Sequence, residues 1–442
     1  MTTFQHPRKP KCPALVRSSK VNGQMTLLDL PVEIVLNIIA WLPRSAKEAR
    51  RKSKQHSIIQ SFKALRLTSK PLAGIVAPVL LDAVNISSTS SARGFLKWCT
   101  DCAAQNRDPP VRRLSIRNVG HPSLSVNPQL VPYDVCEDIL SVIAPGLCEL
   151  KIVFYDCFEF SDKIANSFRR ARRLWALHLQ INTQTPQCTS VPTTATLDAQ
   201  VNLKLHNPYP FLTSLRALPS LSELDLNNCL DHCMPLGSTG QFPSLPCVQH
   251  LRIIIDNNST SSPSHPHKFL FELCRAISDS LLILEIKGSR YEPSKLVPVL
   301  AVARRRLEAL YLSDVVLVQK CRELDFPRLR TFMLDDSRYL TRGEFYSPMF
   351  EQINTLVLRR WMGTDVPLDV PVEAFPNLNR VVLTHTSHLT PDITSLVRQC
   401  QDGNIELLAS AKSMNLKEIW TVDTAEARHR ALQVPFGHTS EA

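Results

Sequence analysis

A short apolar phrase recurs through most of this 442-residue chain and restricts its fold more than any other feature. The phrase has the form apolar-x-x-apolar-x-apolar, and its last two apolar residues alternate as they would on one face of a strand. Clear copies occur at Val111/Leu114/Ile116, Leu147/Leu150/Ile152, Leu174/Leu177/Leu179, Leu221/Leu224/Leu226, Val248/Leu251/Ile253, Leu281/Leu284/Ile286, Leu307/Leu310/Leu312 and Leu329/Phe332/Leu334. Weaker copies follow at Ile353/Leu356/Leu358, Leu378/Val381/Leu383 and, imperfectly, Leu416/Ile419. Recurrence at steps of 22 to 47 residues predicts a repeat architecture with one strand per copy.

Helical patterns lie in the longer gaps between these phrases. Apolar residues at helical spacing fill 135–143, 269–277 and 296–303, and a strand–helix–strand order makes successive strands parallel. Most steps lie in or near the range of about 20–29 residues found in leucine-rich repeats. The segment of this chain that best matches the leucine-rich phrase is Leu221-Ser-Glu-Leu-Asp-Leu-Asn-Asn-Cys229. Residues 83–430 therefore resemble a degenerate leucine-rich-repeat array. The resemblance implies an α/β fold, a curved and irregular solenoid with parallel strands inside and helices outside.

Strand alternation also identifies a candidate binding surface. Every second side chain of each predicted strand points away from the helices, onto what we expect to be the concave face. The residues there carry both signs of charge, which favours a protein or peptide ligand over nucleic acid, for which one sign is expected. For any single one of them, a merely solvated side chain is an equally good interpretation. The predicted substrate-binding residues are Arg117, Lys151, His178, Asp225, Asn227, Arg252, Glu285, Lys287, Tyr311, Asp335, Arg359 and Thr384.

Positive charge is concentrated in the first part of the sequence. The chain carries 51 Lys and Arg against 40 Asp and Glu, a net charge of +11. Residues 1–70 account for all of this excess, with 14 basic and 3 acidic residues, which leaves 37 of each sign in residues 71–442. A basic total suggests nucleic-acid binding, but the neutral remainder gives the repeat region no general attraction to phosphate.

Three short helical stripes precede the repeats. Residues 1–24 have the polar, basic composition of a disordered tail. The first helix is expected to start at Pro31, which suits a first helical position, and to end before Pro43. Further stripes cover 58–65 and 72–79. So small a module buries little surface alone, which favours completion by a partner.

Two segments of this helical module resemble an F-box. They are Leu30-Pro31-x-Glu33-Ile34 with the helix that follows, and Leu65-Arg66-Leu67-Thr68-Ser69-Lys70, and they occur in the order that the family has. The resemblance covers residues 27–82, within a predicted domain at 25–82. The basic link at 43–57 is longer than the few residues that this family usually has there. Surface insertions of that kind cost little free energy.

An F-box followed by leucine-rich repeats, as in fungal F-box proteins, implies the substrate-receptor subunit of an SCF (cullin–RING) ubiquitin ligase. In such a receptor the helical module docks on the SCF adaptor subunit, and through it on the cullin and RING subunits, while the repeats hold an unidentified protein substrate. The receptor itself catalyses nothing and needs no cofactor. The residues that match the family's docking positions are Leu30, Pro31, Ile34, Val35, Ile38 and Leu42, with Leu65 and Pro78 in support.

Motifs for catalysis or metal binding are not found in the sequence. It has no Gly-x-Gly-x-x-Gly, no Gly-Lys-Ser/Thr phosphate loop, no His-Glu-x-x-His and no Gly-x-Ser-x-Gly. Cys99 and Cys102 have zinc-ligand spacing without a second pair to complete four ligands, and Cys229, His232 and Cys233 form a smaller cluster. We interpret both groups as structural cysteines.

Other functions remain open at this stage. A leucine-rich-repeat scaffold or inhibitor without ligase recruitment would use residues 27–82 only as a helical cap, as the long 43–57 link allows. A nuclear factor associated with nucleic acid would use the basic N-terminal region. The absence of a signal-peptide pattern or an apolar run of 18 residues predicts no membrane and a cytoplasmic or nuclear location. A 431–442 tail is expected to be disordered.

Overall fold

The computed structural model describes residues 81–120, 130–155, 160–182, 209–230, 245, 247–255, 266–288, 292–335, 340–359, 370–384, 394–410 and 415–433. For residues 209–210, 212–213, 266 and 426–433 it describes the backbone alone. The chain divides into two compact units, Met1–Leu81 and Asp82–Ala442. All described residues except Leu81 belong to the second unit, whose architecture follows.

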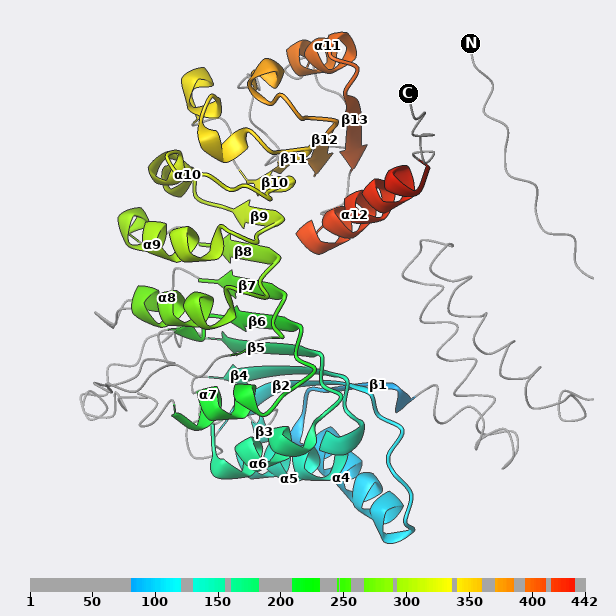
Figure 1. Ribbon diagram of the computed structural model, residues 1–442. Helices are drawn as coiled ribbons and strands as arrows, with labels where there is room; N and C mark the ends of the chain where they lie inside the picture. Colours follow the sequence, from blue (N-terminus) through cyan, green and yellow to red (C-terminus); the bar gives the residue numbers. More distant parts are fainter. Residues whose placement is uncertain are drawn as a thin grey trace, which may run out of the picture. The chain divides into compact units, whose positions relative to one another are not determined.

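One parallel sheet of 13 strands runs through the second unit (Figure 1). Its order is that of the sequence, from β1 to β13, except that the short β3 pairs only with β2. The strands are β1 (Ala83–Ile86), β2 (Arg113–Gly120), β3 (Val131–Pro132), β4 (Glu149–Tyr155), β5 (Ala176–Asn182), β6 (Glu223–Asn227), β7 (His250–Ile254), β8 (Ile283–Lys287), β9 (Ala309–Leu312), β10 (Thr331–Leu334), β11 (Thr355–Arg359), β12 (Arg380–Thr384) and β13 (Glu406–Ser410). The predicted parallel α/β ladder is confirmed.

The apolar phrases set the register of this ladder. The central apolar residue of each copy pairs with that of the next, for example Leu224 with Leu251 and Leu251 with Leu284. The same register extends to the weaker copies, where Leu356 pairs with Val381. Because side chains alternate along a strand, this alignment collects the apolar residues of every repeat on one face of the sheet.

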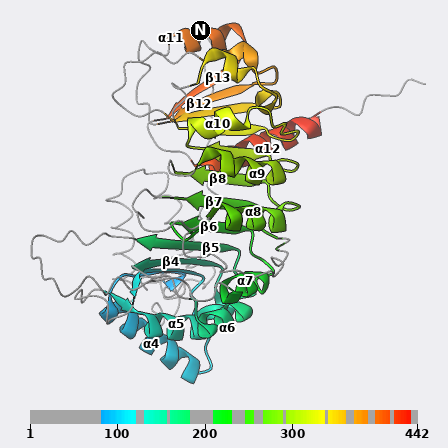
Figure 2. The same ribbon diagram turned by 90° about the vertical axis from the view of Figure 1, so that its left-hand side faces the viewer.

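Helices cover that apolar face. They are α4 (Thr89–Ala104), α5 (Tyr133–Ile143), α6 (Asp162–Arg170), α7 (Tyr209–Arg216), α8 (Pro266–Ile277), α9 (Pro293–Ala303), α10 (Val315–Cys321) and α11 (Thr394–Asp402). Figure 2, which looks onto this helix layer, shows α8, α9 and α10 stacked in chain order in front of the strands. The layer and the sheet enclose one continuous apolar core. The sheet face opposite the helix layer is called the front face below.

Short 3-10 turns replace full helices towards the end of the ladder. These are η7 (Arg342–Phe345), η8 (Pro348–Phe350) and η9 (Val372–Ala374), whereas η3 (Ala144–Gly146) only extends α5. Phenylalanines fill the space that a helix would otherwise occupy: Phe350 lies 5.3 Å from Phe332 and 5.6 Å from Phe375, measured between ring centres. Large aromatic side chains thus keep the core closed where the backbone supplies less cover.

The predicted last repeat copy is wrong. Leu416 and Ile419 lie in helix α12 (Leu416–Gln433), and the last strand is β13, whose Leu407 pairs with Val381. An apolar spacing of three residues fits one helix face as well as it fits the start of a repeat phrase. Asn415 directly precedes the helix and caps it, because its side chain accepts a hydrogen bond of 2.7 Å from the Glu418 amide. Of the expected tail at 431–442, residues 434–442 lie outside the described residues.

Candidate partner-binding face

Six of the predicted surface residues form one unbroken row across six neighbouring strands of the front face. The strand register aligns each member with the next along the sheet. In order from β4 to β9, the row is Lys151, His178, Asp225, Arg252, Glu285 and Tyr311. Alternation within strands therefore predicted both the face and the neighbours on it.

The other predicted residues lie two positions further along their strands, on the same face of the sheet. Asn227 aligns with Ile254 and then with Lys287, and Arg359 aligns with Thr384. Arg117 is exposed on β2, at the point where the pairing with β4 shifts register. Asp335 directly follows β10.

Ionisable side chains of the row contact one another in its middle. Asp225 lies 3.3 Å from His178 Nδ1 and 3.8 Å from Arg252 NH1, both measured from its Oδ2 atom. Glu285 is buried, with 4% of the residue exposed, and its carboxylate lies 3.5 Å from Arg252 Nε. The two acids therefore hold Arg252 between them across three strands.

Two further residues, which the sequence analysis missed, complete this network. His250 is buried and its Nε2 lies 2.9 Å from Glu285 Oε1. Glu223 Oε1 lies 3.8 Å from His250 Nδ1 and 3.9 Å from His178 Nε2. Both residues precede the predicted row by two positions, so the same alternation would have found them. We call Lys151, His178, Glu223, Asp225, His250, Arg252 and Glu285 the polar half of the front face.

The row changes character at β9. After Tyr311 it continues through Met333, Val357 and Val382, all buried, to Leu408 on β13. We call Tyr311, Met333, Val357 and Val382 the covered half. The cover is helix α12, whose Leu416 and Ile419 join these side chains and Ile283 and Ala309 in a second buried cluster. Figure 1 shows α12 on the side of the sheet opposite α8, α9 and α10.

Polar contacts also join α12 to the sheet. The Trp420 indole donates to Glu308 at 3.2 Å, and Asp423 accepts from Thr331 at 3.0 Å and from Arg380 at 2.6 Å. Loss of water around Asp423 raises the pKa of its carboxyl, although the hydrogen bonds from Thr331 and Arg380 work in the opposite direction. At its start, α12 places the Lys417 ammonium against Glu223 and 5.1 Å from the centre of the Trp175 ring.

A polar triad joins Tyr311 of the covered half to two residues beyond it, Asp335 and Arg359. The Tyr311 hydroxyl donates to Asp335 at 2.7 Å and accepts from Arg359 at 3.0 Å, while Arg359 lies 3.2 Å from Asp335. Burial and the Asp335 carboxylate raise the pKa of Tyr311, so the phenol stays protonated. Glu285, Tyr311, Asp335 and Thr384 are buried, so the expectation that they form accessible binding surface is corrected. His250 and Arg252 hold Glu285, α12 covers Tyr311, and Arg359 holds Asp335.

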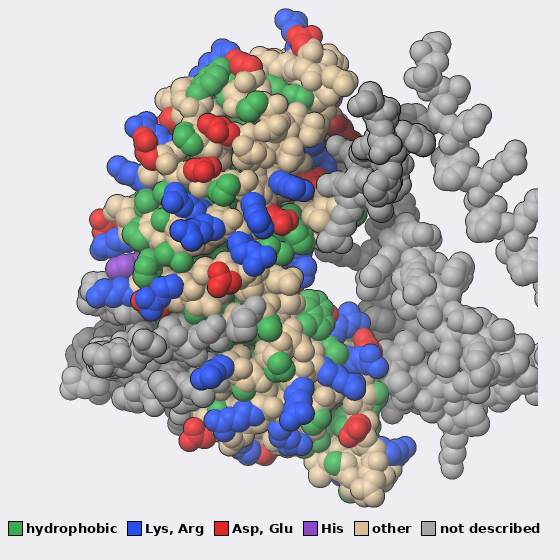
Figure 3. Space-filling view, in the orientation of Figure 1, with side chains coloured by type: hydrophobic (Ala, Val, Ile, Leu, Met, Phe, Trp, Pro, Cys, Tyr) green, Lys and Arg blue, Asp and Glu red, His purple; other side chains and the backbone are tan. Residues whose placement is uncertain are grey.

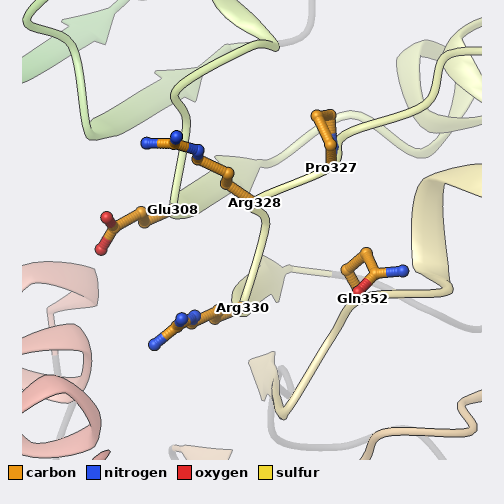
Figure 4. A pocket seen from close by; sticks show the side chains of 5 residues that line it. All are labelled: Glu308, Pro327, Arg328, Arg330 and Gln352. Atoms are coloured by element: carbon orange, nitrogen blue, oxygen red, sulfur yellow. The ribbon is translucent and has the colours of Figure 1, made fainter. Parts of the chain in front are cut away.

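An open pocket of about 240 Å³ borders this cover (Figure 4). Its walls are the turns that lead into β9, β10 and β11, and its lining residues are Glu308, Pro327, Arg328, Arg330 and Gln352. Glu308 is also the acceptor of the Trp420 hydrogen bond. In Figure 3, Lys and Arg side chains gather over the turns around α9, β9 and β10, with acidic side chains between them.

Possible metal ligands do not gather anywhere among the described residues. No group of three or more His, Cys, Asp or Glu side chains there could hold a metal ion. Cys99 is buried on α4, and burial raises the pKa of its thiol to about 12; Cys229 is also buried, whereas His232 and Cys233 lie outside the described part. In that same part, no helix has the length and apolar content needed to span a membrane.

The residues predicted to dock on an adaptor all precede the described part of the chain. They are Leu30, Pro31, Ile34, Val35, Ile38, Leu42, Leu65 and Pro78. Their role therefore stays a prediction from sequence.

The ladder places this chain in the class of parallel α/β repeat proteins of the solenoid kind. No protein-family model matches the chain, and no curated protein matches it. Among solved structures, it is similar to a chain in the crystal structure of the Rad7 and Elc1 complex in yeast, with 14% sequence identity and a TM-score of 0.29. That similarity covers 84% of this chain and 98% of the other.

Proposed function

We propose that this protein is the substrate-recognition subunit of an SCF (cullin–RING) E3 ubiquitin ligase. It docks on the SCF adaptor through residues 25–82, reaches the cullin and RING subunits through that adaptor, and binds a protein substrate on the front face. The observation that carries this proposal is the order of two sequence patterns. An F-box-like segment, Leu30-Pro31-x-Glu33-Ile34 with Leu65-Arg66-x-x-Ser69-Lys70, immediately precedes a leucine-rich-repeat pattern.

The contribution of such a receptor to the reaction is positional. It holds a substrate lysine near a ubiquitin-charged enzyme, which turns a rare encounter into an effectively intramolecular one. No side chain of this chain then takes part in covalent chemistry, and the protein works without a cofactor in the cytoplasm or the nucleus.

The polar half of the front face supports the substrate-binding part of the proposal. It presents a carboxylate, Asp225, next to a guanidinium, Arg252, and an exposed ammonium, Lys151. A surface that mixes donors and acceptors in this way fits the backbone and side chains of a polypeptide. It lacks the single sign of charge that phosphate backbones select.

Co-purification with the SCF adaptor subunit tests the proposal. Full-length wild type is compared with Leu30→Ala/Pro31→Ala, and with Lys9→Ala/Pro10→Ala as a matched control of the same size outside the F-box-like segment. We expect the adaptor to be retained by wild type and control and lost by the Leu30→Ala/Pro31→Ala variant. Circular dichroism melting of the three proteins shows that the repeat unit is intact in each.

Failure of the wild type to retain the adaptor would contradict the proposal. The second candidate, a leucine-rich-repeat scaffold or inhibitor without ligase recruitment, would then take its place. The feature that favours it is the long basic link at 43–57, which departs from the F-box pattern.

A further inference from the structure

Helix α12 contacts the front face through side chains at regular spacing. Lys417, Trp420 and Asp423 are each three residues apart, so they lie along one side of the helix. Leu416 and Ile419 are buried beside them. The opposite side faces solvent: Glu418 and Thr421 are exposed, and Val422 is 49% exposed. The helix therefore has a defined contact side that combines a cation, an aromatic ring and a carboxylate with two apolar anchors.

The sheet presents a complementary partner to each polar member of that side. Glu223 and the Trp175 ring receive Lys417, which is an ion pair combined with a cation–π contact. Glu308 accepts from the Trp420 indole. Arg380 and Thr331 donate to Asp423, and the apolar floor between these contacts receives Leu416 and Ile419.

These contacts are few and stand apart from the main core. Of the α12 side chains that the structure describes, only Leu416 and Ile419 are fully buried, and both belong to the second cluster on the front face. The continuous core between the sheet and the helix layer contains none of the α12 side chains that are described. An element held by so little apolar burial opens at a free-energy cost well below that of unfolding the ladder.

The polar half continues directly from the site of Lys417. Glu223, which receives Lys417, also lies near His178 and His250, so a ligand that engages this network competes with the first turn of α12. The row from His178 to Arg252 then offers further contacts outside the area that α12 occupies.

We propose that the front face is a helix-binding site and that α12 is its resident, displaceable occupant. The partner is an amphipathic helix with a basic, an aromatic and an acidic side chain at positions i, i+3 and i+6, flanked by apolar residues. It takes the place of α12 over β6–β12 and extends onto the polar half. This inference rests on the proposed function only in assigning that helix to the substrate.

A labelled peptide with the sequence of residues 415–433 tests this site directly. Its binding to full-length protein is measured by fluorescence anisotropy for wild type, for Lys417→Ala/Trp420→Ala and for the matched control Glu418→Ala/Val422→Ala, which alters the solvent side of α12. We expect the peptide to bind the Lys417→Ala/Trp420→Ala chain at least about tenfold more tightly than wild type or control, because the tethered helix competes less well in that variant. A second peptide, with the charges at 417 and 423 exchanged, should not bind.

Each contrary result overturns the proposal. If the Lys417→Ala/Trp420→Ala chain keeps the melting curve of the control but binds no peptide, the face is not a helix-binding site. If instead the melting temperature of the whole repeat unit falls relative to the control, α12 is an integral part of the fold. Equal binding of the two peptides would show that the charges do not select the ligand. The adaptor experiment above does not involve α12, so either proposal fails independently of the other.

Discussion

The polar half and the covered half of the front face occupy equivalent positions of the same ladder, but their side chains are stabilised in different ways. Arg252 and Val357 belong to one register-aligned row. In the polar half, the carboxylates and Arg252 are paired across neighbouring strands, as Arg252 is between Asp225 and Glu285. In the covered half, apolar side chains are removed from water by an element from outside the ladder. The repeat thus determines the direction in which a side chain points. The type of residue at that position determines whether it is stabilised by an ion pair within the sheet or by a covering helix.

Introducing a charge beneath α12 should show this difference most strongly. We expect Val357→Asp to weaken the docking of α12 by about 3 kcal/mol or more, because the new carboxylate would be buried beneath the docked helix without a partner. Lys151→Asp, at an exposed position of the same row, is the matched control and should change it by no more than about 0.5 kcal/mol. Amide hydrogen exchange of residues 416–424 in the full-length variants measures both. Similar losses for the two would mean that the halves do not differ in this way.

The boundary between the halves depends on Glu223. We expect Glu223→Gln to weaken the docking of α12 by about 0.5–1 kcal/mol, because Lys417 loses its ion pair with a carboxylate. The effect is small because the Lys417 side chain is 39% exposed and water screens the ion pair. The measurement is amide hydrogen exchange of residues 416–424, which should become faster than in wild type. Glu149→Gln, in the same row two strands away, is the control and should leave exchange unchanged. Unchanged exchange in Glu223→Gln would show that the polar half makes no contribution to the docking of α12.

A smaller effect is expected from pH. Asp423 has its pKa raised above the ordinary value of 3.8 when α12 is docked, so the docked helix binds protons more strongly than the free one. Docking therefore gains free energy as the pH falls through the interval between the raised pKa and 3.8, and loses it as the pH rises again. Exchange of the α12 amides, corrected for intrinsic rates, should show this contribution in wild type but not in Asp423→Asn. Identical pH profiles for the two proteins would assign the dependence to other groups.

The ladder could be predicted from sequence because its signal is local. Each apolar phrase specifies a strand, and alternation around it specifies which residues share a face, as the row from Lys151 to Tyr311 confirms. The apolar residues Met333, Val357 and Val382 also indicate that the front face is covered there. With their neighbours they form the unbroken apolar runs 332–334, 356–358 and 381–383, and such runs are typical of sheets covered on both faces.

Helix α12 could not be predicted from the same local signal. Leu416 and Ile419 fit a repeat phrase and a helix equally well, and the spacing says nothing about which face of the sheet a helix will cover. Its contacts join residues far apart in sequence, such as Glu308 with Trp420 and Glu223 with Lys417. Complementary partners at that separation are recognisable only once the register of the sheet is known.

The place of α12 in the chain also has a consequence for the order of events during synthesis. Strands pair in sequence order, and domains generally begin to fold from the N-terminal side as they leave the ribosome. The ladder from β1 to β12 is therefore available before residues 416–424 emerge. During that interval the nascent chain presents the apolar floor of Met333, Val357 and Val382 to the cell, so a chaperone or an early partner has its best access to this floor before translation ends.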